Sequence, residues 1–237
     1  MLYLIGLGLN EKNLSIQALE VLEKCEKIYL EDYTVEFPYT KDNLEEVINN
    51  KITIVNRQFM EEKAKNIATE SKKAEIAILV YGSPLTATTH VSLLQELRKN
   101  KVKYKIIHNA SVLDAIAETG LQLYKFGKIA SMPKWQKSFK PVSFMEVVKE
   151  NQSIKAHSLI LVDIGLEFHD AMKELEISAK NKVKIDKIVV CSRLGTEESQ
   201  ILYGKPLNLV KKKVKAPFCI IIPSELHFME KEFLENI

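Results

Sequence analysis

Ile76-Ala77-Ile78-Leu79-Val80-Tyr81, an unbroken apolar run, is followed at once by Gly82-Ser83-Pro84-Leu85-Thr86-Ala87-Thr88-Thr89-His90. A short apolar run closed by Gly and Pro predicts a buried strand of a parallel sheet that ends in a turn. Open α/β sheets bind ligands at the carboxyl ends of such strands. The Thr-rich segment offers hydroxyl and backbone N–H groups before a helix expected at 91–99. It is therefore either a contact for a polar small molecule or a loop whose Thr caps that helix.

The alternation of strand and helix extends through the first half of the chain. Strands are expected at 1–6, 27–33, 52–56, 76–81 and 103–108, and helices at 15–25, 44–49, 61–73 and 91–99. About five strands with intervening helices are enough for a doubly wound, mostly parallel sheet. We therefore expect an N-terminal α/β domain over residues 1–109.

The second half, residues 110–237, has a different pattern. Helices are expected at 111–119, 143–151, 167–180 and 210–212, and strands at 128–132, 158–164, 185–191, 199–204 and 218–223. Several neighbouring strands are separated by too little chain for a crossover helix, so antiparallel or mixed pairing is expected. The prediction is a two-domain α/β protein whose C-terminal domain has a mixed sheet with helices.

Composition narrows the class of protein. A hydrophobic content of 46% with 27% charged residues is typical of a globular chain. No apolar run reaches the roughly 18–20 residues that span a bilayer, and the chain opens directly in a strand pattern. We expect a cytoplasmic protein with no membrane partner. A net charge of +3 is too small to indicate a nucleic-acid partner.

Cysteine and histidine spacing argues against a metal site. Cys25, Cys191 and Cys219 are far apart and are expected to be buried thiols. The five histidines are scattered without a metal-ligand spacing, so no metal is expected.

One stretch, residues 119–145, contains no acidic residue. It includes Trp135 and Phe139 together with Lys125, Lys128, Lys134, Lys137 and Lys140. A Lys-rich stretch is either an ordinary solvated surface or a docking face for an acidic macromolecule.

Two glycines, Gly6 and Gly8, follow the first expected strand and suggest a dinucleotide-binding turn. The position of the third glycine is Glu11, a carboxylate that would repel a pyrophosphate, so a nicotinamide-dependent dehydrogenase is disfavoured. The sequence has no nucleophile elbow, phosphate loop or paired-carboxylate signature. Any chemistry is therefore expected to come from a bound cosubstrate.

A second apolar strand ends at His108-Asn109-Ala110-Ser111. Asn109 or Ser111 either caps a helix there or lines the same sheet edge as the loop at 82–90.

Four motifs together resemble a known family. They are Leu4-Ile5-Gly6-Leu7-Gly8-Leu9, Gly82-x-Pro84-Leu85-x-Ala87-Thr88-Thr89-His90, Ile107-His108-Asn109-Ala110-Ser111 and Gly120-Leu121-Gln122-Leu123-Tyr124-Lys125-Phe126-Gly127-Lys128. In this order they resemble the diphthine synthase family of the tetrapyrrole-methylase-like superfamily, and the resemblance covers nearly the whole chain.

The resemblance implies a two-domain homodimer with a cleft between the domains that binds S-adenosylmethionine. It implies repeated methylation of a modified histidine on translation elongation factor 2 to give diphthine, a step towards diphthamide. Some members of the family also methylate the carboxylate of that side chain. Carried over by position, the implied cosubstrate contacts are Leu9, Ser83, Thr86, Ser111, Val112, Val162, Leu194 and Phe218. No catalytic residue is implied.

The chain departs from the family at three positions. Ser83 stands where the family commonly has Asp, Thr86 where Val is usual, and Ser224 where Gly is common. A hydroxyl at position 83 still accepts a hydrogen bond but lacks the charge of a carboxylate. Two alternatives stay open on sequence alone: a tetrapyrrole C-methyltransferase of the precorrin or uroporphyrinogen type, and a non-catalytic S-adenosylmethionine-binding protein of the same fold.

Overall fold

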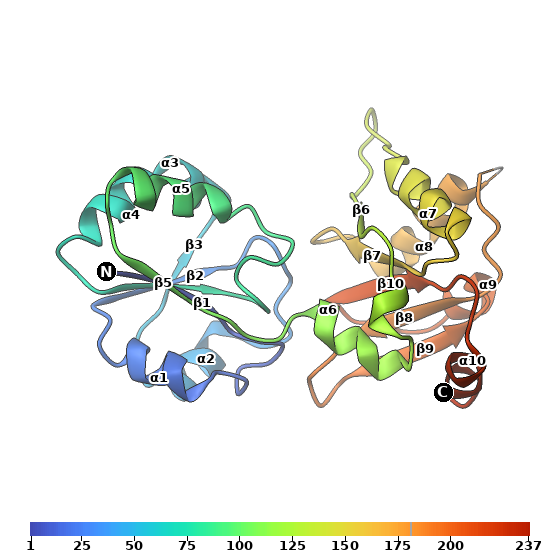
Figure 1. The fold of residues 1–237 in the computed structure, drawn as a ribbon, viewed down its shortest axis with the longest axis horizontal. Coiled ribbons are helices and arrows are strands. Elements are labelled where there is room, and N and C mark those ends of the chain that lie inside the picture. Colours follow the sequence, from blue (N-terminus) through green and yellow to red (C-terminus); the bar gives the residue numbers. More distant parts are fainter. Residues whose placement is uncertain (181) are drawn as a thin grey trace. The chain divides into compact units, whose positions relative to one another are not determined.

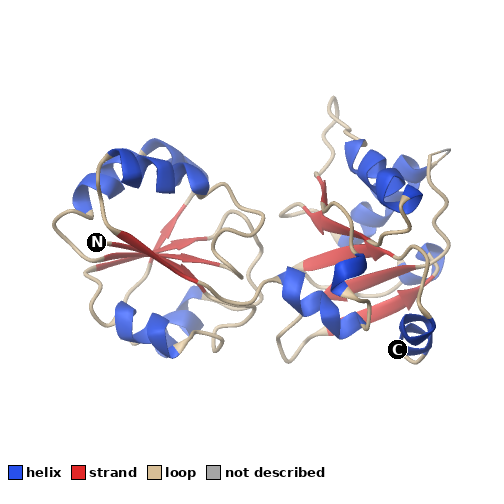
Figure 2. Ribbon diagram, viewed as in Figure 1, coloured by secondary structure: helices blue, strands red, loops and turns tan. Residues whose placement is uncertain are grey.

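A computed structural model describes residues 1–180 and 182–237. The chain divides into two compact units, Met1–Val112 and Leu113–Ile237, each built on a sheet with helices packed against it. The division falls within a short helix, α6 (Val112–Ala115). Each unit therefore has its own sheet and its own core (Figures 1 and 2).

The sheet of the first unit is parallel and has the strand order β3-β2-β4-β1-β5. Its strands are β1 (Leu2–Gly6), β2 (Lys27–Glu31), β3 (Thr53–Val55), β4 (Ile76–Val80) and β5 (Tyr104–Ile107). β4 lies between two neighbours, and its side chains alternate between the two faces: Ala77 and Leu79 join one core cluster, Ile78 and Val80 the other. Both faces are buried, which explains why β4 is apolar at every position.

Helices cover both faces of this sheet (Figure 1). One face carries α1 (Ile16–Leu22) and α2 (Lys41–Ile48); the other carries α3 (Arg57–Glu62), α4 (Ala64–Glu70) and α5 (Val91–Lys99). The expected helix at 61–73 was wrong as a single element, because the backbone of Lys63 leaves the helical region and separates α3 from α4. α2 begins earlier than expected because Thr40 and Asn43 form a capping box.

The second unit has a mixed sheet with the order β6-β7-β10-β8-β9, as the short connections predicted. Its strands are β6 (Ala130–Met132), β7 (Ser158–Val162), β8 (Ile188–Ser192), β9 (Gln200–Gly204) and β10 (Phe218–Ile222). β6 and β7 pair in parallel, and the remaining pairs are antiparallel.

The helical elements of this unit surround the sheet (Figure 2). They are η1 (Ile116–Thr119), η2 (Leu123–Lys125), α7 (Ser143–Ser153), α8 (Phe168–Ala179), α9 (Pro206–Leu209) and α10 (Phe228–Glu235). The helix expected at 210–212 was wrong: the helix lies earlier, at α9, and starts at Pro206, a residue suited to a first helical position. Cys25, Cys191 and Cys219 are buried free thiols, as predicted. Within the described residues, no helix has both the length and the apolar character needed to cross a bilayer.

Candidate functional site

Three loops of the first unit leave the sheet at one edge, because β4, β1 and β5 are parallel neighbours. The loop after β1 is joined to the loop after β4 by two backbone hydrogen bonds: Gly8 N–H donates to the Gly82 carbonyl (3.2 Å), and Gly82 N–H donates to the Gly8 carbonyl (2.9 Å). A Cβ at Gly6 would lie 2.6 Å from the Gly82 carbonyl oxygen, so the close approach requires glycine there. The two glycine turns thus form one surface.

The third loop, after β5, is tied to the first by Asn109. Its side-chain amide donates to the carbonyls of Gly6 (3.1 Å) and Asn13 (2.9 Å), and its carbonyl oxygen accepts from Ala110 N–H (2.8 Å). Asn109 therefore holds loops together. The loop after β4 also lies close to the loop after β5, since a Cβ added at Gly82 would lie 3.5 Å from the Cα of Ser111.

The cosubstrate contacts implied for the first unit lie on these loops. Leu9 and Ser111 are buried, whereas Ser83, Thr86 and Val112 are half-buried. The Leu9 carbonyl accepts from the Tyr81 hydroxyl (3.1 Å).

Tyr81 belongs to an aromatic cluster with Phe37 and Tyr39. The Phe37 ring meets each of the other two rings nearly edge-on, at 5.3 Å between centroids. These rings pack the loop after β2 against the end of β4 and so support the position of Leu9.

The Thr-rich loop ends at His90, which directly precedes α5. His90 makes no side-chain capping bond to α5, and the Thr88 hydroxyl donates back to the Pro84 carbonyl (3.1 Å). Thr88 thus closes the loop on itself. The residue that precedes α5 is His90, so the interpretation of a Thr cap on this helix is not supported.

Behind the loop lies a buried pair of titratable groups that the sequence interpretation missed. His90 is 2% exposed, and its Nε2 lies 3.7 Å from Oε2 of Glu31, the fully buried last residue of β2. Glu31 accepts hydrogen bonds from the Tyr33 and Thr34 N–H groups and from the Thr34 hydroxyl. Burial raises the pKa of Glu31, and these hydrogen bonds oppose the rise; burial lowers the pKa of His90. The sequence signal was Glu31 alone, a charged residue that ends a parallel apolar strand, and it did not indicate the pairing with His90.

The implied contacts of the second unit gather at one edge of its sheet. Val162 ends β7, Leu194 follows β8, and Phe218 opens β10, which runs antiparallel to both strands. Leu194 is buried, and the Phe218 ring packs edge-on against Phe168 at 5.5 Å. These three side chains are apolar or aromatic, whereas the edge of the first unit presents backbone polar groups and hydroxyls.

The eight implied contacts thus form two groups, one in each unit. The first edge has the chemistry to hold a polar small molecule, and the second has the chemistry to cover an apolar face. Among residues 1–180 and 182–237, no group of three or more His, Cys, Asp or Glu side chains is arranged to hold a metal ion.

Comparison with known proteins gives consistent matches over the whole chain. The family Tetrapyrrole (Corrin/Porphyrin) Methylases matches residues 1–207. The chain is 40% identical to the diphthine methyl ester synthase of Homo sapiens, over 99% of this chain and 94% of the human protein. It is 36% identical to the diphthine synthase of Methanocaldococcus jannaschii, over 100% of this chain and 98% of that protein. A crystal structure of diphthine synthase superposes with a TM-score of 0.90 at 31% identity, covering 100% of this chain and 95% of that one.

Proposed function

The chain belongs to the tetrapyrrole methylase family and within it to the diphthine synthases, and we propose that it methylates the modified histidine of translation elongation factor 2. It is an S-adenosylmethionine-dependent methyltransferase of diphthamide biosynthesis. The proposed function is supported by the full-length similarity to diphthine synthases, which includes both units. We infer that it is a homodimer, as the family resemblance implies, and that it acts in the cytoplasm.

We propose methyl-donor contacts in each of the two units. Leu9, Ser83, Thr86, Ser111 and Val112 would contact the donor from the first unit, and Val162, Leu194 and Phe218 from the second. In support, the loops after β1, β4 and β5 are joined by the bonds of Gly8, Gly82 and Asn109, so their backbone groups are fixed before a ligand arrives. Fixed groups lose little conformational entropy on binding.

In the proposed chemistry, the main task of the protein is to align the acceptor nitrogen with the methyl carbon of the donor. The amine nitrogen forms a bond to the methyl carbon as the carbon–sulfur bond breaks, and the sulfur leaves as a neutral thioether. A primary or secondary amine then releases a proton to water, whereas a tertiary amine has no proton to release and becomes a quaternary ammonium. Proximity and orientation can supply roughly 7–11 kcal/mol of such a barrier. The residues proposed above would therefore act by holding the donor, and none is assigned as a general acid or base.

The relatives' names point to two different products, a diphthine and a diphthine methyl ester. The first requires methyl transfer to nitrogen, and the second also requires transfer to a carboxylate oxygen. Esters are cleaved by mild alkali and methylated amines are not, so one treatment separates the two outcomes.

The test is methyl transfer with purified components. The chain is incubated with S-adenosylmethionine and elongation factor 2 that carries the aminocarboxypropyl histidine, and the factor is followed by mass spectrometry before and after mild alkali. Stepwise gain of methyl groups on that histidine is expected; their persistence after alkali identifies the amine as the acceptor. Factor lacking the modification and a uroporphyrinogen-type tetrapyrrole serve as control substrates. Methylation of the tetrapyrrole alone, or of neither substrate, would contradict the proposal.

A further inference from the structure

A loop of the second unit, residues 133–142, projects from the sheet between β6 and α7 (Figure 1). It begins directly after Met132, the last residue of β6, which pairs with Val162 at the end of β7. Val162 is one of the proposed donor contacts. The loop therefore begins at the sheet edge that carries the proposed donor contacts of the second unit.

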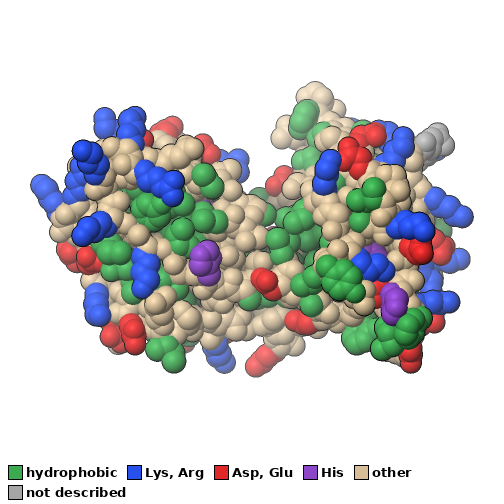
Figure 3. Space-filling view, viewed as in Figure 1, with side chains coloured by type: hydrophobic (Ala, Val, Ile, Leu, Met, Phe, Trp, Pro, Cys, Tyr) green, Lys and Arg blue, Asp and Glu red, His purple; other side chains and the backbone are tan. Residues whose placement is uncertain are grey.

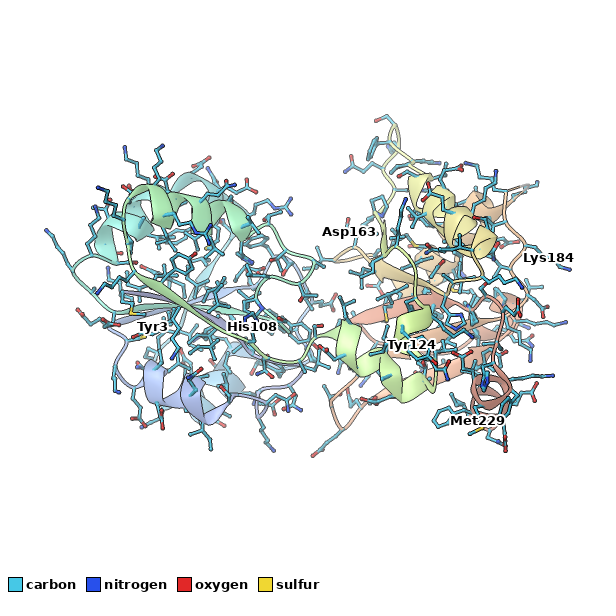
Figure 4. The ribbon with its side chains drawn as sticks, in the orientation of Figure 1. Tyr3, His108, Tyr124, Asp163, Lys184 and Met229 are labelled. Carbon is cyan, nitrogen blue, oxygen red and sulfur yellow. The ribbon has the colours of Figure 1, made fainter. Side chains whose placement is uncertain are left out.

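The base of the loop is braced at two residues. Lys134 donates from its backbone N–H to Asp163 (3.2 Å) and from its ammonium to the Gly165 carbonyl (2.7 Å). Trp135 donates from its backbone N–H to the buried carboxylate of Glu174 (3.0 Å). Asp163, labelled in Figure 4, directly follows β7, so these bonds connect the loop to β7 and to α8.

The tip of the loop is a closed turn. Gln136 and Phe139 exchange backbone hydrogen bonds of 2.9 and 3.3 Å, which leaves Lys137 and Ser138 at the turn. The Trp135 indole N–H donates to the Pro141 carbonyl (3.0 Å) and joins the two sides of the loop. The backbone is therefore fixed by hydrogen bonds from its base to its tip.

This fixed backbone presents an apolar ring and positive charge. The Phe139 side chain is 58% exposed, although a Phe ring gains free energy by burial. Lys137 is exposed at the turn, and the Lys140 ammonium lies over the Trp135 ring, 5.7 Å from its centre. A preformed loop with an exposed aromatic ring has the features of an anchor that enters a pocket on another protein.

The structure also separates the lysines of the acid-free stretch 119–145 that bind groups within the chain from those positioned to contact a partner. Lys125 is bound by the buried Glu230 and by the Glu225 carbonyl, and Lys128 pairs with Glu150. Lys134 is used in the brace described above. Lys137 and Lys140 are the members of the stretch that lie on the tip with Phe139.

We propose that residues 133–142 are the docking loop for the folded protein substrate, with Phe139 entering an apolar pocket and Lys137 and Lys140 facing an acidic rim. The proposal rests on the proposed function, because it names how that substrate is bound. A protein partner is favoured over RNA because basic and acidic side chains are interspersed over the face in Figure 3 and the net charge is only +3.

The test compares two double variants under steady-state conditions. K137E/F139A alters the docking loop; the matched control, K212E/F228A, alters an exposed Lys and an exposed Phe elsewhere in the second unit. We expect the KM for elongation factor 2 to rise about tenfold in the loop variant, while kcat and the KM for S-adenosylmethionine stay at wild-type values. K137E alone should weaken the salt dependence of the KM for the factor. The control variant should match the wild type throughout.

The outcomes separate this proposal from the one it rests on. If the wild type transfers no methyl group to the factor, both proposals fail. If the wild type turns over and the loop variant has an unchanged KM for the factor, the docking loop alone is overturned. The same holds if the rise in KM disappears after nuclease treatment, since the loop would then bind RNA.

Discussion

Gly6 shows at the scale of one residue how closely the first sheet edge is packed. A Cβ at this position would lie 2.6 Å from the Gly82 carbonyl oxygen and 2.9 Å from Cδ of Pro84. Gly204, which ends β9, is different: a Cβ there would meet Leu209 at an ordinary contact distance of 3.5 Å. The two glycines therefore form a matched pair for substitution by alanine.

We expect G6A to lower the free energy of unfolding by about 1–3 kcal/mol, because the added methyl group pushes the loop after β4 away from β1. G204A should change it by less than about 1 kcal/mol. Urea unfolding of both variants measures the difference. Equal destabilisation of the two would show that the contact between Gly6 and Gly82 is not tight.

Ser83 is the departure from the resembled family that bears most directly on the donor, because the family commonly has Asp there. A carboxylate at this half-buried position would attract the cationic groups of S-adenosylmethionine, which a hydroxyl does less strongly. We expect S83D to lower the Kd for S-adenosylmethionine about tenfold, whereas the neutral S83N leaves it near the wild-type value. Calorimetric titration measures both. An unchanged or higher Kd for S83D would remove Ser83 from the proposed contacts.

Among the helices and strands, the sequence patterns predicted those features that depend on neighbouring residues. The apolar run of β4 predicted a strand buried on both faces, and the short connections of the second half predicted mixed pairing. The break at Lys63 was not visible, because no Gly or Pro marks it. The contact of His90 with Glu31 was not visible either, because it joins positions far apart in the chain.

In the candidate site too, the features set by local sequence patterns were predictable and the long-range contacts were not. Parallel strand order brings the loops after β1, β4 and β5 to one edge, and this was predictable from the strand pattern. The role of Asn109 was not, because its amide binds carbonyls of Gly6 and Asn13, roughly a hundred residues earlier. Periodicity carries no information about such long-range hydrogen bonds.

The C-terminal helix α10 is held by a buried carboxylate. Glu230 accepts hydrogen bonds from the Gln122 and His227 N–H groups, from Lys125 and from His157. In the sticks of Figure 4, α10 is marked by Met229 and the η2 turn by Tyr124. Burial alone would raise the pKa of Glu230, but these partners outweigh it and lower the pKa to about 2.

This arrangement predicts a loss of stability in acid. Because the folded pKa lies below the unfolded value, the ionised carboxylate stabilises the fold fully above about pH 5, by the order of 3 kcal/mol, and this is lost as pH falls from about 4.5 towards 2. In urea unfolding from pH 7 to 2.5, the difference between wild type and E230Q should therefore shrink with falling pH. E225Q, on the surface, is the matched control and should follow the wild type. A difference between wild type and E230Q that stays constant with pH would contradict the assignment.

In the whole molecule, the proposed donor contacts are found in both units, and each unit has its own core. A ligand that contacts both should protect the backbone of both from hydrogen exchange. At about 100 times its Kd it should also raise the free energy of unfolding by about 2.7 kcal/mol. S-adenosylmethionine and its demethylated product are suitable probes because neither requires the protein substrate.

We expect slower exchange at 81–90 and 108–111 in the first unit and at 161–164 and 193–195 in the second. Exchange at β9 should not change, because none of the proposed contacts lies in that strand. Hydrogen exchange with mass spectrometry, with and without ligand, measures all of these segments at once. Protection confined to the first unit would mean that Val162, Leu194 and Phe218 do not contact the donor, and the site would have to be rebuilt from the loops after β1, β4 and β5 alone. Protection in both units would support the contacts proposed in each of them.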